Sequence, residues 1–393
     1  MNPDLEQLHP YPFEKLATLF NKLPASDKTP VSFSIGEPQH PAPEFVQQVL
    51  RENTALLSRY PATNGLPELR QAIADWLVRR FKLTTVDQDR QVIPVNGTRE
   101  ALFAFTQALL DRQRRPLVLM PNPFYQIYEG ATLLGGGEPV YLPCTSASGL
   151  QPDFDAVGED VWIRTQLLFI CTPGNPTGAT LSKAQLKALI QLADKYDFVI
   201  ASDECYSEIY QDRAPAGLLQ ACAEMGRHDY RRCVVFHSLS KRSNLPGLRS
   251  GFVAGDGEIL QRFLRYRTYH GCAMPVHHQL ASIAAWNDET HVETNRALYV
   301  EKFRAVLDIL GDVLKVSAPD AGFYLWPRTP IDDESFARQL KAEENVTVLP
   351  GRYLSRTVNG RNPGNNRVRM ALVAELDQCV EGAERMRALI KRL

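Results

Sequence analysis

The sequence has no apolar run of the length that a membrane helix needs and no excess of charge of either sign. A membrane-spanning helix takes roughly 18 or more consecutive apolar residues, and the first residues lack the basic start and apolar stretch of a secretion signal. The 44 basic and 45 acidic residues leave a formal net charge of −1, so no overall field attracts nucleic acid or an anionic membrane. We therefore expect a soluble, cytoplasmic protein that recognises any phosphate or carboxylate locally.

Cysteine is also scarce, since the chain has seven cysteines and none of them is in CxxC spacing. An odd number without such spacing argues against a disulfide framework and against a structural zinc site. We expect most of the cysteines to be small buried residues, and the sequence predicts no metal. Internal repeats and low-complexity tracts are absent as well.

Apolar segments of strand length alternate with helical patterns from about residue 45 onward. The segments are 91–95, 117–120, 167–170, 198–201, 234–236 and 251–254. Spacings of roughly 30 residues leave room for crossover helices, which indicates a buried, mostly parallel sheet. The pattern predicts helices over 69–77 and 186–193, the second capped by Ser182.

The length of 393 residues allows two or three domains. We expect an extended, Pro-rich arm at 1–44 that joins the smaller domain, a large domain at 45–284 and a small C-terminal domain at 285–393. The last region is rich in helical patterns and has short strand segments at 321–326 and 346–349.

The run around Lys241 is the most informative segment of the chain. Ser238, Ser240 and Lys241 follow the apolar stretch 233–236, and Arg249 comes eight residues after the lysine. A lysine can form a Schiff base, and two hydroxyls with an arginine suit one phosphate, which together outline a pyridoxal phosphate (PLP) site. A basic surface turn after a strand is the alternative.

Other polar residues lie where predicted strands end. Gly97 and Thr98 open a helix after the strand at 91–95, and backbone N–H groups at such a start form an anion site. Asp203 ends the strand at 198–201, where a carboxylate can keep a pyridine nitrogen protonated. Tyr206 and Asn175 could donate hydrogen bonds to the cofactor's phenolate oxygen. An ordinary helix cap explains Thr98 or Asp203 equally well when each is taken alone, and a generic turn explains Asn175.

These motifs, taken in order, resemble the fold-type I PLP-dependent aminotransferases of classes I and II. The resemblance runs from about Gly36 to Arg369, and Ser250, where the family more often has an aliphatic residue, is a small departure. It implies an α/β fold whose large domain has a mostly parallel seven-stranded sheet between helices, with a smaller α+β domain beside it. It implies the cofactor PLP, with Lys241, Asp203 and Tyr206 as catalytic residues. The implied cofactor-binding residues are Tyr60, Gly97, Thr98, Arg99, Tyr125, Asn175, Asp203, Tyr206, Ser238, Ser240, Lys241 and Arg249.

The resemblance also bears on the substrate and on the assembly. It implies that Gly36, Asn175 and Arg369 bind the amino acid, with the Arg369 guanidinium gripping the α-carboxylate bidentately. Arg367 would share a strand face with Arg369, so the sequence leaves both open. Tyr60 resembles a tyrosine that reaches the phosphate of the other subunit, which implies a homodimer with shared active sites.

Three segments, 122–128, 240–256 and 362–364, resemble those of bacterial N-succinyldiaminopimelate aminotransferases of lysine biosynthesis. This resemblance implies amino acid and 2-oxo acid substrates, with 2-oxoglutarate as the acceptor. Candidate cations for the distal carboxylates are Arg99, Arg242, Arg352, Arg356 and Arg361. Aspartate, aromatic and kynurenine aminotransferases and C–S β-lyases remain alternatives on the same fold. A ligand-sensing regulator is a further alternative, but we expect no room for a DNA-binding domain before residue 45.

Overall fold

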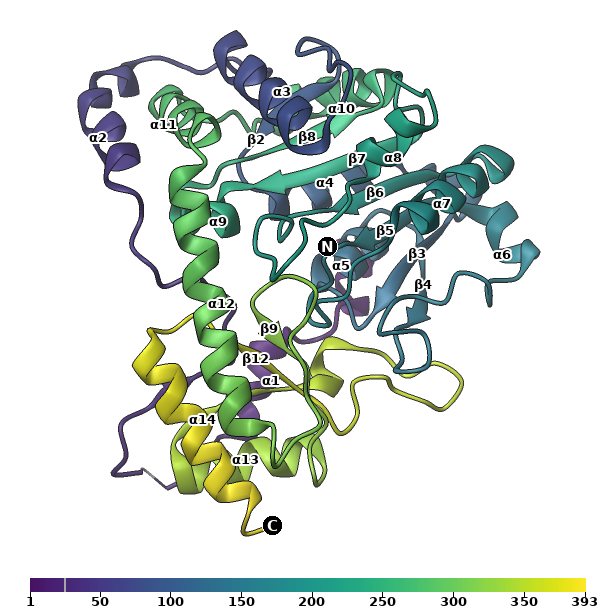
Figure 1. The fold of residues 1–393 in the computed structure, drawn as a ribbon. Helices are drawn as coiled ribbons and strands as arrows, with labels where there is room; N and C mark the ends of the chain where they lie inside the picture. Colours follow the sequence, from purple (N-terminus) through teal and green to yellow (C-terminus); the bar gives the residue numbers. More distant parts are fainter. Residues whose placement is uncertain (25) are drawn as a thin grey trace.

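The computed structural model describes residues 1–24 and 26–393, and a seven-stranded sheet forms the centre of its larger part (Figure 1). The strand order is β2-β8-β7-β6-β5-β3-β4, and β8 is the strand that runs antiparallel to its neighbours. The strands are β2 (Val92–Val95), β3 (Leu117–Asn122), β4 (Glu138–Pro143), β5 (Thr165–Cys171), β6 (Val199–Asp203), β7 (Cys233–Ser238) and β8 (Gly251–Gly255). This mostly parallel α/β sheet confirms the predicted fold class.

Helices bury both faces of the sheet. Successive side chains of a strand point to opposite faces, and in these strands both sets of side chains are apolar. In β5, Leu167 and Phe169 pack with one cluster of buried residues, and Leu168 and Ile170 pack with the other. The first cluster includes side chains of α4 (Thr98–Leu109), α5 (Gln126–Leu134) and α10 (Gly257–His270). The second includes side chains of α2 (Glu44–Glu52), α3 (Pro67–Phe81), α6 (Glu159–Arg164), α7 (Lys183–Tyr196), α8 (Leu218–Glu224) and α11 (Val276–Asn287).

A smaller α+β part follows the sheet, and the long helix α12 (Thr290–Leu310) runs from the sheet region down to it in Figure 1. Helices α13 (Asp333–Glu344) and α14 (Leu376–Ile390) pack there around a separate buried cluster. Strands β9 (Tyr324–Leu325), β11 (Leu349–Pro350) and β12 (Val368–Ala371) form an antiparallel sheet, and β1 (Val31–Ser32) pairs in parallel with β10 (Val346–Thr347). The predicted division at residues 44 and 284 stays a prediction.

The structure differs from the sequence prediction in three places. The arm is not simply extended, because Pro12 begins the helix α1 (Pro12–Leu19), a position where a missing N–H costs nothing. The segment 346–349 is divided into β10 and β11, which join different sheets. Strand β4 was not predicted, because prolines at 139 and 143 disguise an edge strand.

The predicted helices over 69–77 and 186–193 are confirmed as α3 and α7, and Ser182 caps α7 in a capping box with Gln185. The remaining short elements are α9 (Leu239–Arg242), η1 (Pro3–Gln7), η2 (Thr54–Ser58), η3 (Arg112–Arg114), η4 (Pro246–Leu248) and η5 (Gly351–Leu354).

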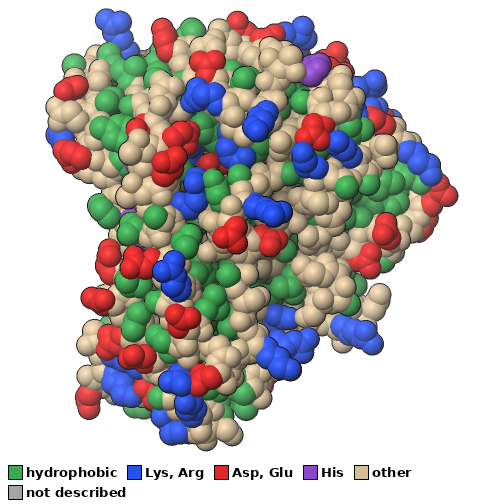
Figure 2. Space-filling view, in the orientation of Figure 1, with side chains coloured by type: hydrophobic (Ala, Val, Ile, Leu, Met, Phe, Trp, Pro, Cys, Tyr) green, Lys and Arg blue, Asp and Glu red, His purple; other side chains and the backbone are tan. Residues whose placement is uncertain are grey.

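Acidic and basic side chains are interspersed on the face of the molecule that Figure 2 shows, which agrees with the balanced charge of the chain. No helix in the described part of the chain combines the length and apolar character that crossing a bilayer requires.

Candidate active site

A cavity of about 420 Å³ lies at the carboxyl ends of the parallel strands, where open α/β sheets bind ligands. Segments that leave β2, β3, β5, β6 and β7 all reach it, because these strands end at the same edge of the sheet. The predicted site residues that line it are Gly36, Thr98, Arg99, Tyr125, Asn175, Asp203, Tyr206, Ser238, Ser240, Lys241, Arg249 and Arg369.

Lys241 lies in the single turn of helix α9, which Ser238 caps by accepting a hydrogen bond from the Ser240 N–H. The Lys241 Nζ donates a hydrogen bond of 2.6 Å to the carbonyl oxygen of Gly36. Burial of the amine lowers the pKa of Lys241 to about 8, and the nearby guanidinium of Arg369 acts in the same direction. The amine therefore exchanges protons readily near neutral pH, as an acid–base group must.

Polar groups suited to a phosphate gather at one end of the cavity. The hydroxyls of Ser238 and Ser240 lie 2.9 Å apart, and both serines line the cavity together with Arg249. A Cβ on Gly97 would lie 2.2 Å from the Arg249 Nη2, and the φ of +86° at Gly97 also favours glycine. Glycine at 97 thus lets the guanidinium approach the backbone that opens α4.

The Asp203 side chain is buried at the end of β6. Its Oδ2 accepts a 2.7 Å hydrogen bond from the Tyr128 hydroxyl, and its Oδ1 accepts one of 3.3 Å from the backbone N–H of Cys205. Burial raises the pKa of Asp203, whereas these donors act to lower it. A buried carboxylate of this kind is suited to a cationic partner in the cavity.

Three other predicted residues line the cavity. Tyr125 lies directly before α5, with its ring edge-on to that of Tyr128. The Tyr206 hydroxyl lies 3.0 Å from the Tyr324 hydroxyl, and burial raises the pKa of Tyr206. Asn175 accepts a hydrogen bond of 3.2 Å from the Arg369 Nη1.

The structure distinguishes Arg369 from Arg367, which the sequence left open. Arg369 lines the cavity, its Nη2 donates to the Ser34 carbonyl at 2.7 Å, and its buried Nε has no hydrogen-bond partner in the described chain. Arg367 instead donates to the Trp326 carbonyl at 2.7 Å and to the Ser146 hydroxyl at 2.9 Å, and it does not line the cavity. Of the two arginines, Arg369 is therefore the one that a ligand in the cavity can reach.

The five candidate arginines for a distal carboxylate are separated in the same way. Arg99 is exposed and lines the cavity, with its guanidinium carbon 5.4 Å from the centre of the Tyr11 ring. The other four candidates do not line the cavity of their own chain. Arg242 is buried against Trp76 and Trp286 and pairs with Glu289, Arg352 pairs with Asp332, Asp333 and Glu334, Arg356 pairs with Glu129, and Arg361 is exposed elsewhere.

Two predicted site residues, Gly97 and Tyr60, do not line the cavity of their own chain. Gly97 lies directly behind Arg249, whereas the Tyr60 side chain is fully exposed. Sequence reasoning in turn missed several lining residues. Some adjoin predicted ones, namely Ile35, Gln126, Cys171 and Cys205, and others come from distant segments, namely Tyr11, Phe13, Tyr324, Leu349 and Leu354. Tyr11 stands directly before Pro12, which begins α1. A proline that can start a helix was therefore the one sequence signal that the arm is folded here.

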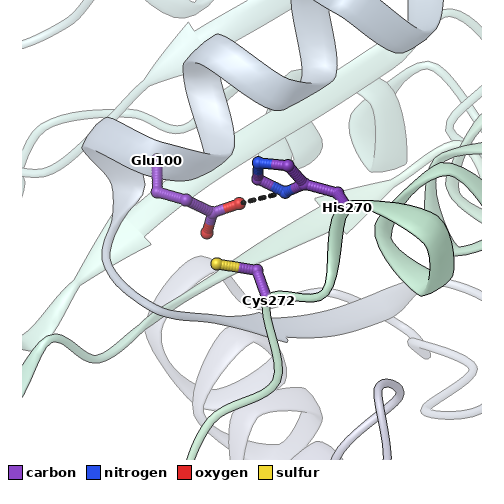
Figure 3. A group of neighbouring side chains, drawn as sticks. All are labelled: Glu100, His270 and Cys272. Atoms are coloured by element: carbon purple, nitrogen blue, oxygen red, sulfur yellow. Dashed lines mark ion pairs between the residues drawn. The ribbon is translucent and has the colours of Figure 1, made fainter.

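Near the start of α4, Glu100, His270 and Cys272 lie close together (Figure 3). The Glu100 Oε1 lies 3.6 Å from the His270 Nδ1 and accepts a 2.7 Å hydrogen bond from Arg267. Because the guanidinium of Arg267 is fully buried, Glu100 serves as its counterion. We interpret the group as an ion-pair network that fixes the start of α4 to the end of α10.

The residues of the cavity fit PLP. The cofactor has a phosphate, a basic ring nitrogen and an aldehyde, and the cavity offers Ser238, Ser240 and Arg249, the buried carboxylate of Asp203, and the Lys241 amine, respectively. Arg249 lies so close to the Gly97 backbone that a side chain at position 97 would collide with its guanidinium.

Comparisons with known proteins agree with this geometry. The profile of the family described as "Aminotransferase class I and II" matches residues 28–382. The LL-diaminopimelate aminotransferase of Desulforudis audaxviator (strain MP104C) is 31% identical over 99% of this chain and 97% of its own. An aminotransferase from Neisseria meningitidis Z2491 has a TM-score of 0.95, with 51% identity over 99% of this chain and 100% of that one. Aminotransferase AspB from Helicobacter pylori 26695 has a TM-score of 0.92, with 35% identity over 98% and 100%.

The family profile spans most of the chain, and the relatives are similar to it from end to end. Both findings agree with a cavity built for one phosphorylated, ring-containing cofactor. The chain belongs to the class I and II aminotransferase family and is a PLP-dependent aminotransferase.

Proposed function

We propose that this aminotransferase takes its amino group from N-succinyl-L,L-diaminopimelate, in the lysine branch of amino-acid biosynthesis, and passes it to 2-oxoglutarate. The free amino acid L,L-diaminopimelate is the second candidate, because similar proteins bear the name LL-diaminopimelate aminotransferase. The two donors differ at the end remote from the reacting carbon. The free amino acid carries an ammonium group there, and the succinylated one carries an amide and an additional carboxylate.

The charge of the cavity lining is the observation that carries the choice. Among the described residues that line it, Arg99, Arg249, Arg369 and Lys241 are basic and Asp203 alone is acidic. Asp203 is buried at the end of β6, so it cannot also receive a distal ammonium group near the mouth. Lys241, Arg249 and Arg369 already serve the cofactor and the α-carboxylate, so Arg99 is the cation that remains for a distal carboxylate, and no acidic lining residue remains for a second ammonium group.

The chain's own residues divide the chemistry between them. Bound PLP supplies an aldehyde that condenses with amines and a ring that withdraws electrons. The Lys241 Nζ takes the proton from the α-carbon of the amino acid and later gives a proton back. Arg369 holds the α-carboxylate, and Asn175, its hydrogen-bond partner, orients the guanidinium. Asp203 keeps the proton on the ring nitrogen.

The deciding experiment is a stopped-flow panel of amino donors with the holoenzyme. For each donor, the panel gives the maximal rate of the half-reaction divided by the apparent dissociation constant. We expect this quotient for N-succinyl-L,L-diaminopimelate to exceed that of every other donor by about tenfold or more, which corresponds to about 1.4 kcal/mol. A similar lead for L,L-diaminopimelate would contradict the proposal and select the second candidate. A lead for aspartate, an aromatic amino acid or kynurenine would replace both, and pyruvate release from a cysteine conjugate would indicate a lyase.

Replacing Arg99 with glutamine is expected to raise the KM for N-succinyl-L,L-diaminopimelate about tenfold, as expected for one charge-assisted hydrogen bond to a carboxylate. Arg99 lines the cavity and, in the described chain, has no carboxylate partner. The value of kcat should change little, because the contact is remote from the reacting carbon. Steady-state kinetics with this donor measures both constants.

Arg361→Gln is the matched control, because Arg361 is exposed and does not line the cavity. It should leave the KM unchanged. If both variants behave alike, Arg99 is a solvated surface charge and has no part in specificity.

We also propose that two chains share their active sites, with Tyr60 reaching the phosphate of the partner's cofactor. The side chains of Tyr60 and nearby Leu57 are exposed, although both are large and largely apolar. Arg249 is exposed as well, so the phosphate end of the cavity has room for a contact from outside the chain. A second copy that covers both surfaces accounts for these exposures.

A mixing experiment tests the shared site. Tyr60→Ala and Lys241→Ala variants should each be weakly active or inactive, whereas their mixed dimer contains one intact site. After subunits exchange at random, about a quarter of the wild-type activity should return. Sedimentation should give twice the chain mass, and a fully active monomer would rule out the arrangement.

A further inference from the structure

Tyr128 is a buried residue that none of the roles above uses. It lies in the first turn of α5, three residues after Tyr125, and its ring is completely shielded from solvent. The ring stacks on Phe169 of β5, with centroids 4.6 Å apart and an interplanar angle of 13°. This packing fixes the direction of its hydroxyl group, which donates to the Asp203 Oδ2 at 2.7 Å.

The Asp203 carboxylate depends on the donors around it because its side chain is buried, with 5% of its surface exposed. An ionised carboxylate in an apolar interior is costly unless hydrogen bonds compensate its charge. The titratable groups that face it are Tyr125 and Tyr128 from the α5 segment, Cys171 at the end of β5, Cys205 after β6 and His237 of β7. Of these, Tyr128 makes the shortest hydrogen bond to the carboxylate, and the Cys205 N–H makes a longer one.

We propose that Tyr128 is a positioning residue that acts through Asp203, holding its carboxylate in place and limiting its basicity toward the ring nitrogen of the cofactor. The inference rests on the role proposed for Asp203. A phenol that donates to one carboxylate oxygen stabilises the ionised form. The proton of the cofactor's ring nitrogen then stays on nitrogen, where the ring needs it to accept electrons.

The position of Tyr128 strengthens this inference. Tyr125, directly before α5, lines the cavity, and its ring lies edge-on to that of Tyr128 with the centroids 5.9 Å apart. The start of α5 therefore supplies the hydrogen-bond donor to the carboxylate, and the residue directly before the helix supplies the expected stacking ring. A displacement of α5 would move both.

The test compares Tyr128→Phe with wild type by using PLP labelled with ¹⁵N in the ring. Phenylalanine keeps the ring and its stacking on Phe169 but removes the hydroxyl. The carboxylate becomes more basic without its donor, so it draws the shared proton toward itself. The ¹⁵N resonance should therefore move toward that of the unprotonated ring, and the dissociation constant of PLP from the apoprotein should rise about tenfold.

Tyr141→Phe is the matched control, since the Tyr141 hydroxyl donates to Glu129 at 2.6 Å, whereas that of Tyr128 donates to Asp203. It should change neither the ¹⁵N resonance nor the PLP affinity. Thermal unfolding of each apoprotein verifies that the variants fold.

A double-mutant cycle separates the role proposed for Tyr128 from simple packing. In an Asp203→Asn background, Tyr128→Phe should change the PLP affinity by no more than about twofold, because the carboxylate through which it acts is gone. An equal loss in both backgrounds would show that Tyr128 acts only through packing, and a wild-type resonance in Tyr128→Phe would also overturn the proposal. If Asp203→Asn alone leaves the resonance unchanged, the role of Asp203 itself is wrong, which is a distinct result.

Discussion

Replacing Lys241 with alanine is expected to reduce transamination by about 10⁴-fold, the upper end of what one general acid–base group contributes. The Lys241 amine is the basic group that combines a position in the cavity with a pKa lowered to about 8. Alanine removes this amine but leaves the hydroxyls and the guanidinium proposed to hold the phosphate. The variant should therefore still bind PLP, with a changed visible spectrum.

Single-turnover rates with the preferred donor measure the effect of this change. Small primary amines added to the Lys241→Ala protein should restore part of the lost rate, because they can occupy the space of the side chain and accept a proton. Turnover of the variant at the wild-type rate without added amine would show that another group is the base.

Replacing Asp203 with asparagine is expected to slow the reaction by about 10²–10³-fold, as for the loss of one preorganised electrostatic contact in a shielded site. The amide has the same shape but no charge, so it cannot hold a proton on the ring nitrogen. The fold should survive because a neutral side chain is easier to bury than a carboxylate whose pKa is raised by burial.

Rates of proton removal from an α-deuterated donor and from its normal form locate the effect of Asp203→Asn. The isotope effect should grow in the variant, because proton removal becomes the slow step. Asp312→Asn, which removes an exposed carboxylate in the smaller part of the molecule, should leave the rate unchanged. Near-native turnover in Asp203→Asn would return Asp203 to the role of an ordinary strand-end residue.

The sequence predicted the central sheet well because its strands are buried on both faces and read as continuous apolar runs. Segments such as 167–170 and 198–201 have this pattern, and they became β5 and β6. Strand β4 lies at the edge of the sheet, where prolines are tolerated, so its local pattern resembles that of a loop. Whether the segment 346–349 forms one strand or two depends on distant partners, which a local pattern does not reveal.

The predicted site residues meet in one cavity for a similar reason. Asp203 ends a strand, Asn175 and Lys241 closely follow one, and parallel strands bring their carboxyl ends together. Tyr11 and Tyr324 were missed because they arrive from the arm and from the smaller part, through contacts that no local spacing encodes. The choice of Arg99 among five arginines likewise required the ion-pair partners of the other candidates.

The most direct test of the account is to find which lysine holds the cofactor. Borohydride reduction of the holoenzyme, followed by digestion and mass spectrometry, should place the phosphopyridoxyl group on the peptide that contains Lys241. Lys302 is a useful comparison, because it is also buried but contacts His40 at 2.6 Å and does not line the cavity. Labelling of Lys241 alone is the predicted result, and labelling of Lys302 or of any other lysine in its place would contradict the account.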